Sequence, residues 1–238
     1  MKIICPSRKR AHIFQTKIED MVVLVDKSEE KDYKNIGFEI DTHEGLTSLS
    51  RIREYAYRRY GDVFFVDDDI VSVERLYTTE NQALTPTEIR DLIFDTQYIS
   101  SQVGAKLYGF NNDPNPTHYN QHKPFMMLGY INGCAMGLNK SDKLYFDPNT
   151  TACESHWISL LNAYYHRYCF IDKRFHFRQK ADSTFILEGG QTGRRSLESE
   201  KNDTLFLRRK FGNSVQIKRE VNKTKQLHEY QRVLNIKL

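Results

Sequence analysis

Short runs of apolar, β-favouring residues recur along the first half of the chain, and each run ends at polar or charged residues. The runs cover Lys2–Pro6, Met21–Asp26 and residues 63–66. They are too short for helices and are typical of strands that are buried on both faces of a parallel sheet. Longer segments separate them, as crossover connections require. The pattern predicts a single-domain α/β fold with a mostly parallel, Rossmann-type sheet flanked by helices.

Apolar residues at helical spacing predict the helices of this fold. A helix is expected over residues 45–60, where Leu49, Ile52 and Ala56 recur on one face. Its arginines, Arg53 among them, are expected on the solvated face. Further helices are predicted over residues 8–19, 85–103 and 154–164, and the charged stretch from residue 198 onward is also predicted to be helical.

The second half of the chain adds short strands and a long polar loop. Strands are predicted over residues 106–110, 168–171 and 174–177, and the apolar residues 125–138 are expected to form buried strands that glycines bend. Residues 111–124 lack periodicity and are long for a connector, which favours a binding loop or lid.

Composition adds few restrictions to this picture. The 238 residues are 39% hydrophobic and 28% charged, with a net charge of +4, which allows an anionic partner without requiring one. The four cysteines have no CxxC spacing, so buried thiols are expected in place of a zinc site. No apolar run reaches the length of a membrane span, and the early basic residues argue against a signal peptide. We therefore expect a cytoplasmic protein without a membrane partner.

Three consecutive carboxylates follow the most apolar strand. Asp67, Asp68 and Asp69 come directly after residues 63–66, at the strand end where an open α/β sheet binds its ligands. Asp67 and Asp69 share one side of an extended chain, and Asp68 faces away. Oxygen ligands of this kind suit Mg²⁺ or Mn²⁺, which bridge to substrate phosphates. The stretch predicts a metal and phosphate site, with an acidic surface turn as the alternative.

Two basic segments are candidates for phosphate contacts. One is the loop Ser7–Arg10, directly after the first strand, where guanidinium groups could clamp phosphates. A solvated basic N-terminus explains this loop equally well. The other is the stretch of residues 188–196, in which Gly190 precedes Arg194 and Arg195.

These residues resemble the GT-A glycosyltransferase family and its DxD motif. The resemblance covers residues 1–195 and implies transfer of a sugar from a nucleotide diphosphate sugar, most often a UDP-sugar, to a hydroxyl acceptor. It implies that Asp67 and Asp69 hold the divalent ion, with His176 or the glycine-bearing loop as a late contact. The implied nucleotide-binding residues are Pro6, Ser7, Arg8, Arg10, Asp26, Asp68, Gly190, Arg194 and Arg195.

The same resemblance gives Glu154 the role of general base in an inverting reaction. Glu154 opens a predicted helix, as the acid of the family's "xED" motif does, but Ser155 stands where that motif carries a second acid. The family division then implies a nucleotide-sugar half over residues 1–75 and an acceptor half over residues 76–195. Residues 196–238 would form a charged, helical extension packed on this domain.

Within the family, the compact size and basic tilt look most like phage-type DNA glycosyltransferases, including the TET/JBP-associated group. That resemblance implies double-stranded DNA carrying hydroxymethylated bases as the acceptor, and the host cytoplasm as the location. A glycan or protein acceptor is the nearest alternative. A haloacid-dehalogenase phosphatase fits less well, because its motif follows the first strand. A non-catalytic nucleic-acid-binding module also fits less well, because carboxylates repel phosphate.

Overall fold

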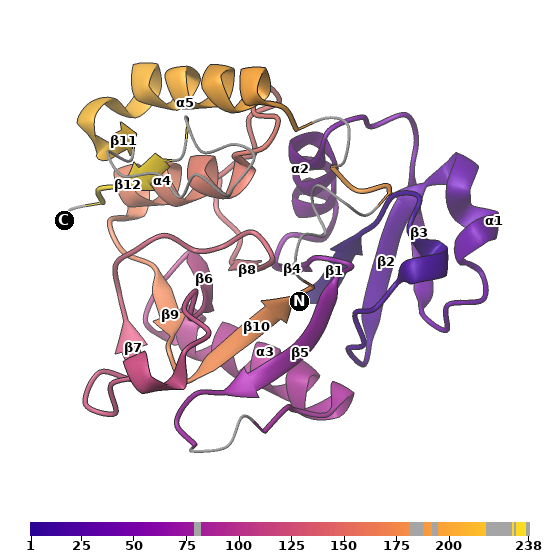
Figure 1. The fold of residues 1–238 in the computed structure, drawn as a ribbon, viewed down its shortest axis with the longest axis horizontal. Coiled ribbons are helices and arrows are strands. Elements are labelled where there is room, and N and C mark those ends of the chain that lie inside the picture. The colour runs from indigo at the N-terminus through magenta and orange to yellow at the C-terminus, as the bar shows by residue number, and fades with distance from the viewer. Residues whose placement is uncertain (79–81, 181–187, 192–194, 218–229, 231, 237–238) are drawn as a thin grey trace.

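The structure is a computed structural model of the 238-residue chain that describes residues 1–78, 82–180, 188–191, 195–217, 230 and 232–236. An eight-stranded sheet with the order β3-β2-β1-β4-β8-β6-β9-β7 forms its centre (Figure 1). Its strands are β1 (Lys2–Pro6), β2 (Met21–Asp26), β3 (Glu39–His43), β4 (Val63–Val66), β6 (Leu107–Phe110), β7 (Phe125–Met126), β8 (Ala135–Leu138) and β9 (Phe170–Asp172).

Most of this sheet is parallel. β1 pairs in parallel with β2 and β4, β2 pairs in parallel with β3, and β6 pairs in parallel with β9. Only β8 and β7 run against their neighbours. The prediction of a mostly parallel α/β sheet is therefore confirmed.

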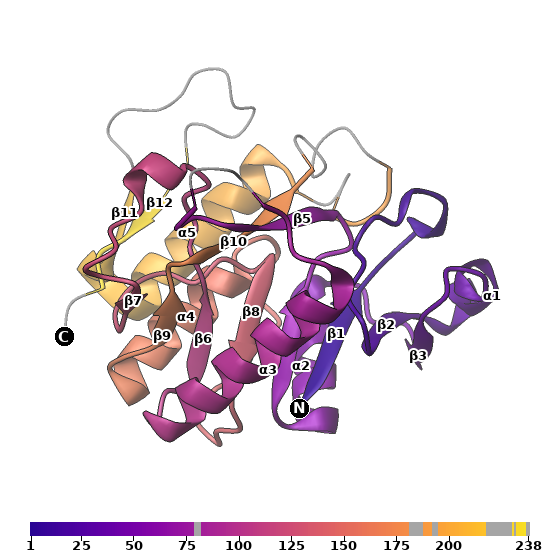
Figure 2. The ribbon, with the colours of Figure 1, turned by 90° about the horizontal axis from the view of Figure 1, so that it is seen from below.

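Helices cover both faces of the sheet. They are α1 (Glu30–Tyr33), α2 (Leu49–Tyr60), α3 (Pro86–Gln102), α4 (Glu154–His166) and α5 (Leu197–Phe211). Figure 2 shows α3 on the opposite face of the sheet from α2 and α4. Phe65 on β4 packs into the core cluster that includes residues of α2 and α4, whereas its neighbour Phe64 packs into the cluster that includes residues of α3. All four residues of β4 have an exposed fraction of 0%. This strand is buried on both faces, as its unbroken apolar run predicts.

A two-stranded sheet lies beyond the central one and starts at the acidic triplet. Its strands are β5 (Ile70–Arg75) and β10 (Phe175–Gln179), which pair antiparallel. This ribbon matters for the site because β5 begins directly after Asp69 and β10 ends at Gln179. Gln179 pairs with Ile70, which places its side chain close to the aspartates. A third, small sheet pairs β11 (Val215–Ile217) with β12 (Arg232–Leu234).

Some predicted elements differ from the observed ones. Residues 8–19 are not a helix, because Arg10, Gln15 and Thr16 make hydrogen bonds to groups outside the segment, and only Ala11–Ile13 form a 3₁₀ turn. Residues 125–138 form two separate strands, β7 and β8, with irregular backbone between them. The predicted helix over residues 45–60 begins later, at Leu49, because the Ser48 side chain accepts a hydrogen bond from the Arg51 amide.

The chain after residue 196 begins with the expected helix. Ser196 is the N-cap of α5 and forms a capping box with Ser199. Phe206 of α5 stacks on Trp157 of α4, with ring centroids 5.5 Å apart. Within the described residues, no helix combines the length and apolarity needed to cross a bilayer.

An ion pair joins β5 to β10 and supports the position of Gln179. Arg178 donates from Nε and Nη2 to the two carboxylate oxygens of Glu74, both at 2.6 Å. The Glu74 residue is 7% exposed, and the Arg178 hydrogen bonds lower the pKa of its carboxyl below the ordinary 4.5. A lowered pKa means that this stabilisation is present above the unfolded-state value and is lost as the pH falls through the folded-state value.

We therefore predict that Glu74→Gln lowers the free energy of unfolding at pH 7 by about 1 kcal/mol, a small value because the Arg178 side chain is 39% exposed. The difference from the wild type should shrink as the pH is lowered below about 4.5. Urea denaturation at a series of pH values measures it, with the exposed Glu39→Gln as control. A difference in the free energy of unfolding between wild type and Glu74→Gln that stays constant down to pH 3 would contradict the assignment of this stabilisation to the Glu74–Arg178 ion pair.

Candidate functional site

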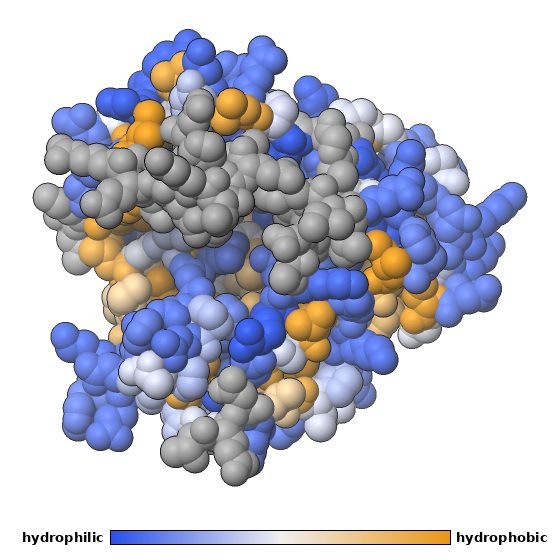
Figure 3. All heavy atoms as spheres, in the orientation of Figure 1, coloured by the Kyte–Doolittle hydropathy of each residue, from blue (hydrophilic) through white to orange (hydrophobic). Residues whose placement is uncertain are grey.

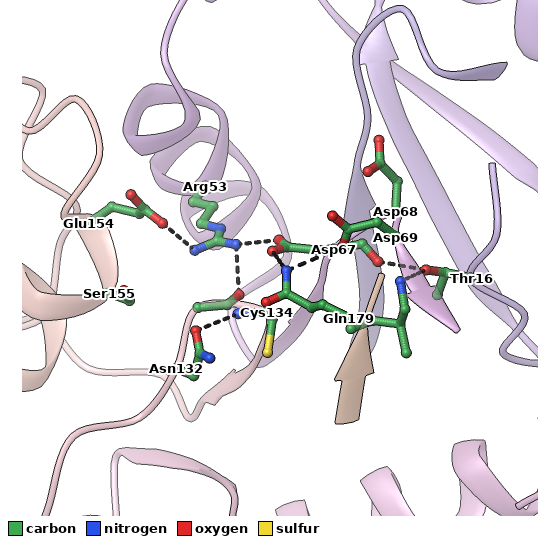
Figure 4. A network of polar contacts seen from close by, with 12 residues as sticks. Thr16, Arg53, Asp67, Asp68, Asp69, Asn132, Cys134, Glu154, Ser155 and Gln179 are labelled. Carbon is green, nitrogen blue, oxygen red and sulfur yellow. Dashed lines mark hydrogen bonds and ion pairs between the residues drawn. The ribbon is translucent and has the colours of Figure 1, made fainter. Parts of the chain in front are cut away.

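The three aspartates form the turn between β4 and β5, and neighbouring segments fix its backbone. The Thr16 hydroxyl donates to the Asp67 carbonyl oxygen at 2.6 Å and accepts from the Ile70 amide at 2.9 Å. The Asp67 amide donates to the Cys134 carbonyl oxygen at 3.0 Å. These contacts hold both ends of the turn, so its carboxylates have defined directions (Figure 4).

Asp67 and Asp69 face a common point. The amide nitrogen Nε2 of Gln179 donates to Oδ2 of Asp67 at 3.1 Å and to Oδ1 of Asp69 at 3.2 Å (Figure 4). A single neutral donor thus lies between two carboxylate oxygens. The prediction that these two side chains share one side of the chain agrees with this geometry.

Asp68 turns instead to the basic loop after β1. Its Oδ2 accepts a 2.5 Å hydrogen bond from the Ser7 hydroxyl, and its Oδ1 accepts from Nη1 of Arg10 at 2.8 Å. The same Arg10 nitrogen lies 3.7 Å from Oδ2 of Asp69. Asp68 therefore orients the loop that was predicted to contact phosphates. Asp68, Ser7 and Arg10 are all buried.

Arg53 is a central residue that the sequence did not reveal. It was expected on the solvated face of its helix, but its exposed fraction is 0%. Its Nη2 donates to Oδ1 of Asp67 at 2.9 Å, and its Nη1 donates to Oε1 of Glu154 at 3.0 Å. Its Nη2 also donates to the Gly133 carbonyl oxygen at 2.7 Å (Figure 4). The prediction was wrong because a guanidinium with buried acidic partners can lie inside the fold.

One pocket gathers most of the predicted site residues. Eight of them line it, namely Pro6, Ser7, Arg8, Arg10, Asp67, Asp68, Asp69 and Gly190. Leu49, Ile52, Gln179 and Gln191 complete the lining, and none of these four was predicted. The pocket lies at the carboxyl ends of β1 and β4, where an open α/β sheet binds ligands.

Gly190 brings a distant segment against the basic loop. Its amide donates to the Arg8 carbonyl oxygen at 2.9 Å, and its backbone adopts a φ of +52°. A Cβ atom at this position would lie 2.6 Å from Cζ of Arg10. Glycine is therefore required here both by the backbone conformation and by the close approach.

Two predicted nucleotide-binding residues lie away from the pocket, and a third lies outside the described residues. Asp26 accepts hydrogen bonds from Ser28 and from the Gly45 amide, which lower the pKa of its carboxyl, and it does not line the pocket. Arg195 pairs with Glu200 at the start of α5. Arg194 lies outside the described residues.

His176 is not brought to the aspartates. Its Nδ1 lies 2.8 Å from the Asn111 carbonyl oxygen, and Gln179, three residues further along β10, takes the place expected for it. The structure therefore places Gln179, and not His176, beside the two aspartates. In an extended strand, positions three apart point to opposite faces, so the two side chains cannot substitute for each other.

The site concentrates acidic side chains around two buried arginines. Within the described part of the chain, four carboxylates, those of Asp67, Asp68, Asp69 and Glu154, contact the guanidinium groups of Arg10 and Arg53. Burial raises the pKa of Asp67 to about 8, Arg53 opposes this rise, and the neighbouring carboxylates add to it. The Asp67 side chain keeps 29% exposure, so its carboxylate remains accessible.

The donor set suits a divalent ion only together with a phosphate ligand. Within the described chain, no group of three or more His, Cys, Asp or Glu side chains could hold a metal ion. Mg²⁺ is, however, usually bound by one or two carboxylates, substrate phosphates and water. Asp67 and Asp69 supply two carboxylates that face one point. The residues therefore fit a cation that arrives with a phosphorylated ligand.

Comparisons with known proteins give fold-level likeness alone. No protein-family model and no curated protein matches the chain. A cytidylyltransferase from Leptospira borgpetersenii is 12% identical, with a TM-score of 0.39, over 85% of this chain and 84% of that one. The 4-diphosphocytidyl-2C-methyl-D-erythritol synthase from Anaerococcus prevotii is 8% identical, with a TM-score of 0.31, over 87% of this chain and 96% of that one.

A protein from STIV is also similar, at 11% identity and a TM-score of 0.38, over 76% of this chain and 87% of that one. TM-scores of this size carry no argument about activity. Any functional conclusion must therefore come from the site itself.

The geometry predicts the behaviour of a Gln179→Glu variant. A third carboxylate at the point between Asp67 and Asp69 adds like-charge repulsion, so the melting temperature without metal should fall by several degrees. Millimolar Mn²⁺ should raise it again, by more than in the wild type, because the ion binds the folded state. Thermal melts with and without Mn²⁺ test this, and Gln191→Glu in the same pocket is the control. If Mn²⁺ raised the melting temperature equally in all three proteins, the result would contradict the claim that Asp67, Asp69 and residue 179 face one point.

Proposed function

We propose that this pocket binds the diphosphate of a nucleotide and that the protein is a nucleotide-dependent transferase, specifically a glycosyltransferase. The observation that carries the proposal is the convergence of Asp67 and Asp69 on one point, in a pocket that also contains Arg8. Paired carboxylates next to a basic loop suit a divalent ion and the phosphates it bridges. The resemblance to GT-A enzymes then favours a nucleotide diphosphate sugar, with UDP-sugars first, as the donor.

The pocket lining combines two chemically different kinds of residue. Pro6, Leu49 and Ile52 supply apolar surface, whereas Arg8 and the aspartates supply charge. A nucleotide diphosphate has the same division, because its nucleoside stacks or packs and its diphosphate carries negative charge. We infer that the nucleoside lies against the apolar residues and that the diphosphate lies between Arg8 and the aspartates.

In this reaction the departing diphosphate develops negative charge. A divalent ion on Asp67 and Asp69 would supply Lewis-acid stabilisation of that charge. The chain's own contribution is fixed positive charge from Arg8 and a backbone held in place by the Gly190 contact. Ser7 and Arg10 contribute indirectly, because their bonds to Asp68 orient this loop.

The acceptor in this proposal is a hydroxyl group. Hydroxymethylated bases in double-stranded DNA come first, on the resemblance to phage-type enzymes and the net charge of +4. A glycan or protein hydroxyl is the alternative. A phosphatase is less well supported, because Asp67, its nucleophile, bonds to both Arg53 and Gln179.

A donor panel tests the proposal. UDP-, GDP- and CDP-sugars are incubated with Mn²⁺ and with DNA that contains or lacks hydroxymethylcytosine, and sugar release and DNA labelling are measured. We expect Mn²⁺-dependent release from one donor, and a loss of roughly 100-fold or more in Asp69→Ala. The exposed Asp142→Ala is the matched control and should keep full activity.

Donor turnover without DNA labelling would support a glycosyltransferase but exclude DNA as its acceptor, and glycan acceptors would be tested next. Turnover of CTP or of simple phosphate esters, with no nucleotide-sugar used, would replace glycosyl transfer by another reaction. Absence of any nucleotide binding in the presence of Mn²⁺ would refute the proposal.

A further inference from the structure

Arg53 connects the donor pocket to the candidate base. Its guanidinium is completely buried and lies between Asp67 in the turn after β4 and Glu154 at the start of α4 (Figure 4). The two contacts are nearly equal in length, 2.9 Å and 3.0 Å. One positive charge is thus shared between two carboxylates that belong to different parts of the site.

Close packing fixes Glu154 toward this guanidinium. A Cβ atom at Gly133 would lie 2.8 Å from Nη1 of Arg53 and 3.2 Å from Oε1 of Glu154, so only glycine leaves room for the contact. The next residue of α4, Ser155, is held through a 2.9 Å hydrogen bond between its hydroxyl and that of Tyr130. Glu154 itself is 8% exposed. Its carboxylate therefore meets Arg53 in a defined geometry.

This arrangement suits a counter-ion better than a general base. A base must reach the acceptor hydroxyl with a free oxygen. In the described part of the chain, Glu154 does not line the pocket that holds the aspartates, and its Oε1 is bonded to Arg53. Without Glu154, Asp67 would be the remaining acidic partner of Arg53 among the described residues.

We propose that Glu154 is a positioning residue that draws part of the Arg53 charge away from Asp67 and so keeps Asp67 able to bind a cation. This inference rests on the proposed function, because it assumes a divalent ion at Asp67 and Asp69. Arg53 and that ion compete for the same carboxylate. The more strongly Glu154 holds Arg53, the less Arg53 opposes the ion.

The opposite reading, in which Glu154 is the base, predicts a different result. Glu154→Gln would then lower the turnover rate and leave Mn²⁺ affinity unchanged. In our account the substitution places the whole Arg53 charge on Asp67. Mn²⁺ affinity should then fall by about fivefold or more, a usual size for coupling between sites.

The test measures Mn²⁺ binding by calorimetry on the full chain, with UDP present in excess and no acceptor. The proteins are the wild type, Glu154→Gln, Glu154→Asp and the double variant Arg53→Met/Glu154→Gln. We expect weaker binding in Glu154→Gln, partial recovery in Glu154→Asp, which restores the charge, and recovery to wild-type affinity or better in the double variant, which removes the competing cation.

Asp203→Asn is the matched control. Asp203 is also a buried carboxylate near the start of α4, where it accepts hydrogen bonds from the Thr151 and Ala152 amides, but these contacts do not include Arg53. Its Mn²⁺ affinity should equal that of the wild type. Circular dichroism of each variant establishes that the fold is kept, and the double variant carries the test if Glu154→Gln does not fold.

Two results would overturn the inference separately from the proposed function. If wild type binds Mn²⁺ and Glu154→Gln binds it equally well, the coupling is refuted and the metal site stands. If the double variant binds as weakly as Glu154→Gln, the loss is structural and the coupling is likewise refuted. If wild type binds no Mn²⁺ and Asp69→Ala changes nothing, the metal-dependent function and the inference both fail.

Discussion

The compensation of three adjacent carboxylates at a buried sheet edge is the constraint on which this structure depends. Asp68 and Asp69 are almost fully buried, and such groups are stable only when hydrogen-bonded and paired. The protein meets the requirement from three distant segments. Arg10 comes from the loop after β1, Arg53 from α2 and Gln179 from the end of β10. The aspartates therefore fix the relative positions of the loop after β1, helix α2 and the end of β10. The pocket forms where these three segments come together.

The way in which these carboxylates are compensated gives the site its chemistry. Asp67 and Asp68 each bond to a guanidinium group, whereas the donor between Asp67 and Asp69 is a neutral amide. A cluster whose carboxylates were all neutralised by arginines would not attract a cation. A cluster without arginines would repel both itself and a diphosphate. The observed balance suits a cation that arrives with phosphate, so metal and nucleotide binding should be coupled.

The sequence predicts the strands and the site's acidic edge because both depend on local patterns. The all-apolar β4 and the position of the triplet after it need no long-range information. Arg53 and Gln179 could not be predicted, because each acquires its role from a partner over a hundred residues away in the chain, Glu154 and Asp67 respectively. Arg53 even follows the pattern of a solvated helix face. The family resemblance implied His176 or the glycine-bearing loop as a late contact, but the register of β10 brings Gln179 to the aspartates.

The most direct test of this account is the affinity for UDP, measured by calorimetry with Mn²⁺ and with EDTA, in wild type and in Asp67→Asn/Asp69→Asn. The account predicts that Mn²⁺ strengthens binding about tenfold or more in wild type, within the usual range of coupling between ligands, and has no effect in the variant. Equal UDP affinity with Mn²⁺ and with EDTA in wild type, or the same strengthening in the variant, would contradict the claim that these two carboxylates hold a cation on a diphosphate.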